Sequence, residues 1–87
     1  MTTLSSDQPE IDYPRQWAYR IVGTSETEIR EHVARCLTGK DYELVLSRQS
    51  RGGRYVSLNL SLVVSDESER QGIFQQVADH QAVRFVL

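Results

Sequence analysis

The chain has one cysteine, Cys36, among its 87 residues. A single thiol cannot form an intramolecular disulfide, so the fold must be stable without a covalent cross-link. Such a chain suits a reducing compartment, and we expect a cytoplasmic location. No apolar run reaches the length of a membrane-spanning helix. The first ten residues are polar and lack a basic stretch followed by an apolar one, so no secretory signal is expected.

Sequence motifs of known enzymes are also missing. GxSxG, HExxH, CxxC and the phosphate-binding P-loop do not occur. Acidic pairs occur only where helices are expected to begin, and helix capping explains them. His32 and Cys36 stand four apart on an expected helix and would supply half of a metal site, but no convincing further ligands accompany them. We therefore expect neither enzymatic activity nor a metal or cofactor.

The chain lacks a strong excess of charge of either sign. Its formal charge is −2 and its isoelectric point is about 5.6. Non-specific binding of nucleic acid depends on clustered Lys and Arg, so this composition does not favour it. The length predicts one domain. We expect residues 1–12, which are rich in polar side chains, to form a mobile tail, and residues 13–87 to form the domain.

A β-hairpin is the clearest element of the sequence. Residues 42–47 and 55–64 read as its two strands, and apolar side chains occupy every second position from Val56 to Val64. Setting Leu46 opposite Leu58 gives both arms one common apolar face. That pairing requires a three-residue loop, Arg51–Gly53, with a glycine at positive φ. A β-bulge would permit another loop length.

Two helices and two further strands flank the hairpin. Ser25 begins a capping box before an expected helix at 26–38, and Ser65 or Asp66 begins a second helix. Residues 17–22 and 82–87 read as strands. The order β-α-β-β-α-β predicts an α+β, ferredoxin-like sandwich: a four-stranded antiparallel sheet in the order 4-1-3-2 with two helices on one face.

The apolar faces of these elements define the expected core. It comprises Tyr19, Ile21, Ile29, Val33, Leu37, Leu44, Leu46, Val56, Leu58, Leu60, Leu62, Ile73, Phe74, Val77, Val83 and Phe85. The opposite face of the sheet is expected to be uncovered, with Val45, Val63 and Val86 among polar side chains. This mixture is too polar for an obligate interface, and it predicts a monomer or a weak homodimer.

Two groups of residues are candidates for binding a small anion. Arg20, Arg84 and Asn59 are expected on the open face, where the guanidinium groups would match a carboxylate or phosphate; the alternative is an ordinary solvated surface. Gly23, Thr24 and Ser25 precede a helix N-terminus, where free N–H groups favour an anion; the alternative is simple capping.

Arg48, Arg51 and Arg54, together with Tyr55, form a basic hairpin tip. They are candidates for binding a protein partner or RNA, and the alternative is a soluble, charged loop. An RNA-recognition domain of this topology would stack bases on exposed aromatic side chains of its central strands. The outward positions here are Ser57, Asn59 and Ser61, so nucleic acid is not the expected partner.

Several segments together resemble the YbeD-like family of small, uncharacterised bacterial proteins. They are Tyr13-Pro14, Ile21-Val22-Gly23, Asp41-Tyr42, Ser50, Gly53, Tyr55-Val56-Ser57 and the ending Val83–Leu87. That family is similar in fold to ACT-type regulatory domains, which bind small effectors near the first strand–helix loop. The resemblance implies a regulatory or ligand-sensing role. Together with the missing enzyme motifs and the mixed open face, it predicts a non-enzymatic regulatory or adaptor module that senses a small anionic metabolite or docks on a larger enzyme.

Two other functions remain open. A small acylphosphatase-like hydrolase shares this topology, although Glu26 and Glu28 would repel a phosphate at the first loop. An RNA-binding module that uses the basic hairpin tip is the other.

Overall fold

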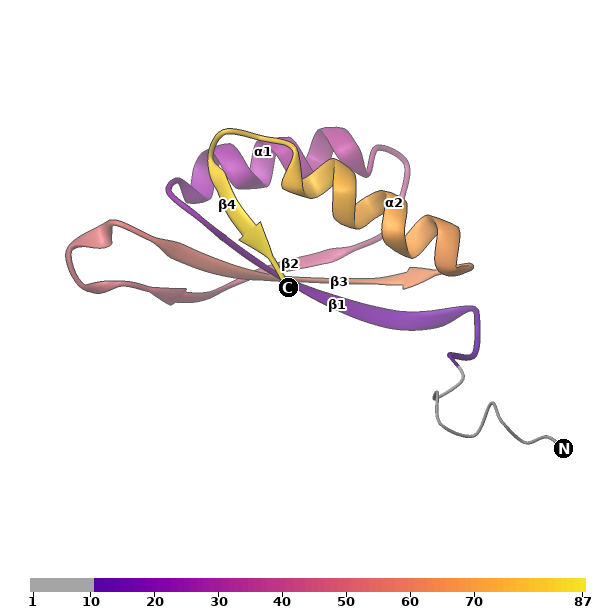
Figure 1. The fold of residues 1–87 in the computed structure, drawn as a ribbon. Helices are drawn as coiled ribbons and strands as arrows, with labels where there is room; N and C mark the ends of the chain where they lie inside the picture. Colours follow the sequence, from indigo (N-terminus) through magenta and orange to yellow (C-terminus); the bar gives the residue numbers. More distant parts are fainter. Residues whose placement is uncertain (1–10) are drawn as a thin grey trace, which may run out of the picture.

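The computed structural model describes residues 11–87, and the greater part of the expected tail lies outside this range. Four strands form one antiparallel sheet in the order β2-β3-β1-β4, and two helices cover one of its faces (Figure 1). The ferredoxin-like βαββαβ fold is therefore confirmed. The elements are β1 (Arg15–Gly23), α1 (Glu26–Cys36), β2 (Glu43–Gln49), β3 (Val56–Val64), α2 (Glu67–Ala78) and β4 (Val83–Val86), with a 3₁₀ turn, η2 (Arg51–Gly53), in the hairpin.

Both helices begin at the expected caps. The Ser25 hydroxyl accepts a hydrogen bond from the Glu28 N–H at the start of α1. Asp66, the second of the two candidates, caps α2 by accepting from the Glu69 N–H. The Glu69 carboxylate in turn accepts from the Ser65 N–H at 2.7 Å. Each cap satisfies backbone donors that the helix itself leaves without a partner.

The core lies between the helices and the β3–β1 centre of the sheet. Leu58 of β3 pairs with Ile21 of β1, and Leu60 pairs with Tyr19. The first three are fully buried, and Tyr19 is nearly so. The Tyr19 hydroxyl donates a hydrogen bond to the Arg70 carbonyl of α2 at 2.6 Å, which ties this helix to the sheet. Among residues 11–87, no helix is long and apolar enough to cross a membrane.

The hairpin has the expected register only in the part far from its loop, from Glu43 to Leu46. Leu46 pairs with Leu58 as predicted, but the ladder shifts by one residue before Arg48, which pairs with Ser57. Ser47 is the extra residue of a bulge, so the loop between Ser50 and Tyr55 has one residue more than predicted. The three-residue loop is therefore wrong, and the bulged alternative is right. Glycines at positive φ are confirmed at Gly52 and Gly53, both within this loop.

A second bulge alters β4. Ile21 pairs with Val86 and Val22 with Phe85, but Gly23 pairs with Val83, so Arg84 has no partner in the ladder. The extra residue changes which side chains face the helices. Val86 is buried beside Ile21, whereas Phe85 is 45% exposed. The prediction that Phe85 lies in the core and Val86 on the open face is therefore wrong.

Three other expected core residues lie at the margins of the helix layer. Leu46 is 37% exposed and Leu44 is half-buried, because β2 is an edge strand and the hairpin extends beyond the helices (Figure 1). Phe74 is 40% exposed on α2. It lies beyond the end of β4, where the sheet offers no strand for it to pack against. The rest of the expected core is buried.

Candidate functional site on the open sheet face

A depression of about 260 Å³ lies on the side of the sheet that the helices leave uncovered. We call it the open-face depression. It is lined by Arg20, Val22, Arg48, Ser50, Tyr55, Val56, Ser57, Phe85 and Leu87. The first strand of the domain, β1, and the last, β4, therefore both contribute to this depression.

Strand register explains why these side chains gather. Arg48, Ser57, Val22 and Phe85 form one continuous row across β2, β3, β1 and β4, because each residue pairs with the next. Neighbouring strands lie about 4.8 Å apart, so side chains in such a row are in contact range. Arg20 is in the next row, where its backbone N–H and C=O exchange hydrogen bonds with Leu87 at 3.0 and 2.9 Å.

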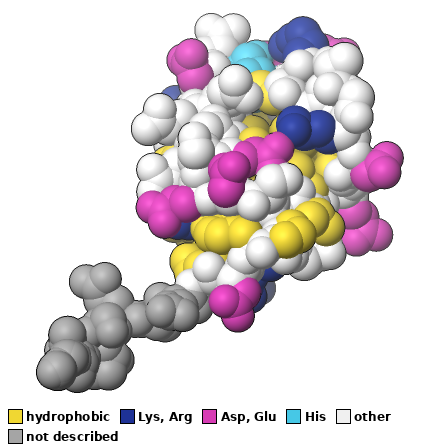
Figure 2. Space-filling model, turned by 90° about the vertical axis from the view of Figure 1, so that its right-hand side faces the viewer, with side chains coloured by type: hydrophobic (Ala, Val, Ile, Leu, Met, Phe, Trp, Pro, Cys, Tyr) yellow, Lys and Arg dark blue, Asp and Glu magenta, His cyan; other side chains and the backbone are white. Residues whose placement is uncertain are grey.

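The depression is cationic at two points. Arg20 and Arg48 make no ion pair within residues 11–87, and no Asp or Glu lines the depression. Glu43, the acidic residue of β2, pairs with Ser61 further along the sheet and does not line the depression. Acidic side chains instead surround exposed hydrophobic ones at the end of the molecule where α2 begins (Figure 2). The two guanidinium groups are thus available to an anion from outside the described chain.

Ser57 supplies a polar atom between the two arginines. Its Oγ is buried and has no hydrogen-bond partner, the one such side-chain atom in the part of the chain that the structure describes. A buried hydroxyl without a partner is costly, and such groups are usually satisfied by water, an ion or a ligand. Val22 and Phe85 form an apolar surface beside it. This combination suits a small molecule with an anionic head and an apolar body.

The structure places the predicted binding residues in three groups. Arg20, Arg48 and Tyr55 line the depression, although the sequence assigned them to two separate sites. Asn59 lies in the neighbouring row, paired with Arg20, and does not line it. Arg84 is the unpaired residue of the β4 bulge, and Leu87 rather than Arg84 lies opposite Arg20.

The remaining predicted residues lie away from the depression. Arg51 belongs to η2, and Arg54 follows it; both are exposed in the hairpin loop. The loop of Gly23, Thr24 and Ser25 is already engaged by its neighbours. The Thr24 N–H donates to the Ala82 carbonyl at 2.9 Å, and Ser25 caps α1. This geometry favours the capping interpretation of the loop.

Val22, Phe85 and Leu87 were not among the predicted site residues. Phe85 and Leu87 were missed because both bulges depend on tertiary pairing, and no local sequence pattern marks them. The β4 bulge turns Phe85 outward, and the Ser47 bulge brings Arg48 opposite Ser57. Exposed aromatic side chains near the end of an edge strand are the only signal that the sequence offered.

His32 and Cys36 lie between the helices. The His32 Nε2 is 2.9 Å from the Gln76 carbonyl oxygen, and the Cys36 Sγ is 3.6 Å from the same nitrogen. The His80 ring lies with its centroid 4.6 Å from that of His32. Burial raises the pKa of the Cys36 thiol, which disfavours its thiolate form. No three His, Cys, Asp or Glu side chains within residues 11–87 are grouped as metal ligands.

Comparison with known proteins places the chain among proteins of unknown function. The family model described as "Protein of unknown function (DUF493)" matches residues 8–87. The chain belongs to the DUF493 family. An uncharacterised protein of Helicobacter pylori strain J99 is 30% identical over 82 residues, covering 93% of this chain and 94% of its own length. A UPF0250 protein of Hahella chejuensis is 26% identical over the full length of both chains. The YbeD-like resemblance is thereby confirmed.

Solved structures agree with the fold of this DUF493 chain. The solution structure of the H. pylori protein HP0495 has a TM-score of 0.82 at 29% identity, covering 100% of this chain and 96% of that one. The ACT domain of the GTP pyrophosphokinase of Chlorobium tepidum has a TM-score of 0.64 at 17% identity, covering 83% and 94%. The second likeness concerns the fold alone. It confirms the ACT-like architecture, and function must be argued from the site.

Proposed function

We propose that this DUF493 chain is a non-enzymatic regulatory module that senses a small anionic metabolite in the open-face depression. One observation carries the proposal: Arg20 and Arg48 face a shared depression that no Asp or Glu side chain lines, beside the buried and unpartnered Ser57 hydroxyl. Paired guanidinium groups recognise carboxylates and phosphates through charge-assisted hydrogen bonds.

The dimensions of the depression restrict the ligand. About 260 Å³ is slightly below the usual range for small-molecule sites, so the ligand is a compact metabolite rather than a nucleotide. Its anionic group would bind Arg20 and Arg48, and its apolar part would cover Val22 and Phe85. Such a ligand would shield Phe85, which is otherwise half-exposed, from water.

The lining side chains support binding rather than catalysis. The ionisable side chains are two arginines and one tyrosine, without a His, Cys, Asp or Glu to act as a general base near neutral pH. The acylphosphatase alternative would require free N–H groups in the loop after β1. There the Thr24 N–H already donates to Ala82, and Glu26 and Glu28 occupy the first turn of α1.

Calorimetric titration of the full chain tests the proposal. The probes are 3-phenylpropionate and phenyl phosphate, which have an anionic head and an apolar body, and inorganic phosphate, which has the head alone. We expect the first two to bind more tightly than phosphate. Arg20→Gln and Arg48→Gln should each weaken binding by about tenfold or more, because a hydrogen bond to a charged group contributes roughly 1.5–3 kcal/mol.

Arg84→Gln is the matched control, since Arg84 lies on the same sheet but does not line the depression. Equal losses in all three variants would indicate general charge attraction and contradict the assigned site. Turnover of benzoyl phosphate that Arg20→Gln abolishes would overturn the non-enzymatic assignment. Binding of a single-stranded RNA probe that depends on Arg51 and Arg54 would instead favour the hairpin tip as the functional surface.

A further inference from the structure

Ser57 carries the one buried hydroxyl of the open-face depression that has no partner. Its Oγ makes no hydrogen bond within residues 11–87. The hydroxyl of Ser50, which also lines the depression, is already engaged, because it accepts a hydrogen bond from the Tyr55 N–H at 2.9 Å. The Tyr55 side chain is 47% exposed and open to water. Ser57 is therefore the lining residue whose polar atom neither the chain nor bulk solvent satisfies.

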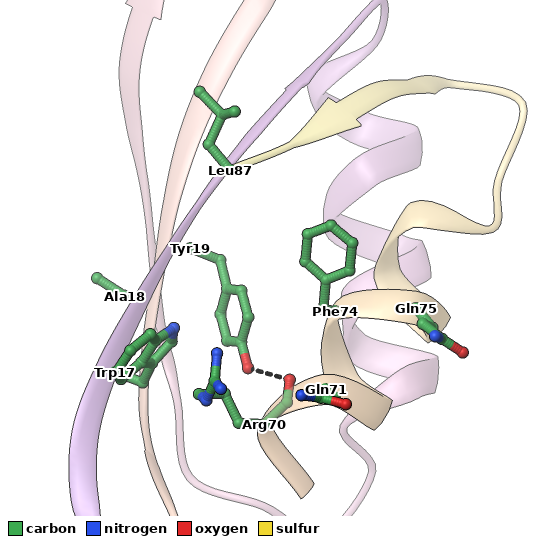
Figure 3. A pocket seen from close by; sticks show the side chains of 8 residues that line it. All are labelled: Trp17, Ala18, Tyr19, Arg70, Gln71, Phe74, Gln75 and Leu87. Atoms are coloured by element: carbon green, nitrogen blue, oxygen red, sulfur yellow. Dashed lines mark hydrogen bonds between the residues drawn. The ribbon is translucent and has the colours of Figure 1, made fainter. Parts of the chain in front are cut away.

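A second hollow of the chain shows how buried hydroxyl groups are satisfied elsewhere. It has a volume of about 430 Å³ and lies between β1 and α2 (Figure 3). There the Tyr19 hydroxyl donates a hydrogen bond to the Arg70 carbonyl at 2.6 Å. No buried side-chain polar atom that lines this hollow lacks a partner in the described part of the chain. Because a buried hydroxyl without a partner costs free energy, the exception at Ser57 points to a ligand.

The order of side chains across the sheet decides which part of a ligand faces Ser57. One row runs from β2 to β4 and consists of Arg48, Ser57, Val22 and Phe85. Arg20 lies in the next row on β1, so the two guanidinium groups approach from either side of β3. Neighbouring strands lie about 4.8 Å apart. A ligand that reaches from the arginines to the apolar pair therefore passes over Ser57 next to its anionic group.

We propose that this ligand is a 2-hydroxy or 2-oxo acid, and that Ser57 recognises the oxygen on the carbon next to the carboxylate. The inference rests on the proposed function and names the ligand class of the same site. Ser57 as a whole is partly exposed and lines the depression, so rotation about its Cα–Cβ bond turns the hydroxyl toward the ligand. The hydroxyl then donates to the ligand oxygen and gains the partner that it lacks. An ammonium group at this place is disfavoured, because the charged side chains that line the depression are both arginines.

Calorimetric titration of the full chain compares acids that share one apolar body. The probes are 3-phenylpropionate, which lacks the added oxygen, 3-phenyllactate, which carries it on the carbon next to the carboxylate, and 3-hydroxy-3-phenylpropionate, which carries it one carbon further away. Phenylalanine, with an ammonium group in place of the hydroxyl, is the fourth probe. We expect one enantiomer of 3-phenyllactate to bind about three- to tenfold more tightly than each of the other acids, the factor typical of one neutral hydrogen bond.

Ser57→Ala removes the hydroxyl and leaves both arginines in place. In this variant the preference for 3-phenyllactate over 3-phenylpropionate should disappear, whereas the affinity for 3-phenylpropionate should change by less than about twofold. Ser61→Ala is the matched control and should keep the preference, because Ser61 lies on the same face of β3 but outside the depression. A merely structural role of Ser57 would instead lower the melting temperature of the free variant and weaken the binding of all the acids equally.

The possible outcomes separate this inference from the proposed function. If 3-phenylpropionate and 3-phenyllactate bind equally to the original chain, or if the preference survives in Ser57→Ala, the ligand class is overturned and the anion site remains. Tighter binding of 3-hydroxy-3-phenylpropionate or of phenylalanine would overturn it as well. If none of the acids binds at millimolar concentration, the proposed function fails together with the inference.

Discussion

Gly23 and Gly72 form a matched pair of glycine-to-alanine substitutions with opposite expected effects. A Cβ added at Gly23 would lie 2.1 Å from the Ala82 carbonyl oxygen and 2.8 Å from the Ile29 Cδ1. The Ile29 side chain can move, but the Ala82 carbonyl is held by the Thr24 N–H at 2.9 Å. An alanine must therefore push the start of β4 away from β1 by roughly 1 Å, which is overpacking against backbone.

The magnitude follows from this clash. Overpacking costs typically about 1–3 kcal/mol, and a backbone obstacle places Gly23→Ala at the upper end, about 3 kcal/mol. Gly72 lies within α2 and has no atom within 4 Å of the added Cβ. Gly72→Ala should therefore stabilise the protein by about 0.5–1 kcal/mol through helix propensity. The two variants should differ by about 4 kcal/mol in their free energy of unfolding.

Urea unfolding, followed by Trp17 fluorescence and by far-ultraviolet circular dichroism, measures both free energies. In a domain of this size, about 3 kcal/mol corresponds to a fall in melting temperature of roughly 12–24 °C. If the free energy of unfolding of Gly23→Ala lies within about 0.5 kcal/mol of that of the original protein, the close approach of β4 to β1 is refuted. A destabilised Gly72→Ala would refute the placement of Gly72 in an open helical position.

Three further predictions follow from single contacts. Leu58→Ala should cost about 2–5 kcal/mol in urea unfolding, because this fully buried side chain lies at the centre of the sheet. Burial raises the pKa of Tyr19 above 10.0 in the folded protein, so this hydroxyl loses its proton at a lower pH in the unfolded chain, and stability should fall as the pH rises through the folded pKa. Tyr19→Phe should lack this alkaline loss, and it should also lose the hydrogen bond to Arg70, which contributes about 1 kcal/mol. The hydrogen bond from Lys40 lowers the pKa of Glu69 below 4.5, so the stability that this hydrogen bond contributes should be lost as the pH falls through the lowered pKa. Carboxyl titration by NMR should show that the pKa of Glu69 lies closer to 4.5 in Lys40→Ala.

The parts of the fold that the sequence predicts well are those that depend on local chemistry. Ser25 and Asp66 begin helices because their side chains cap free N–H groups, and this chemistry is visible in a few residues. The alternation from Val56 to Val64 predicts a strand with one buried face, and the burial of every second residue confirms it. The strand order then follows from the sequence of elements.

The candidate site depends on features of another kind. A bulge adds one residue to one strand, and its position is decided by how the whole sheet pairs. The extra residue at Ser47 brings Arg48 opposite Ser57 on the open face, and the extra residue at Arg84 turns Phe85 toward the same depression. Strict alternation assigns each later residue in these strands to the opposite face. The exchange of Phe85 and Val86 between core and open face, and the absence of Phe85 from the predicted site, therefore have one cause.

The same bulges account for the composition of the open-face depression. In a strictly regular β4, Arg84 would face outward, and Phe85 would compete for space beneath α2, as the sequence pattern predicts. With the bulge, the smaller Val86 fills the core position beside Ile21, and the aromatic ring moves to the surface beside Arg20. A half-exposed phenyl ring loses the free energy of full burial, roughly 1–2 kcal/mol. Because an anionic ligand with an apolar body would recover part of that free energy, binding of such a ligand should be weakened by Phe85→Ala even though both arginines remain.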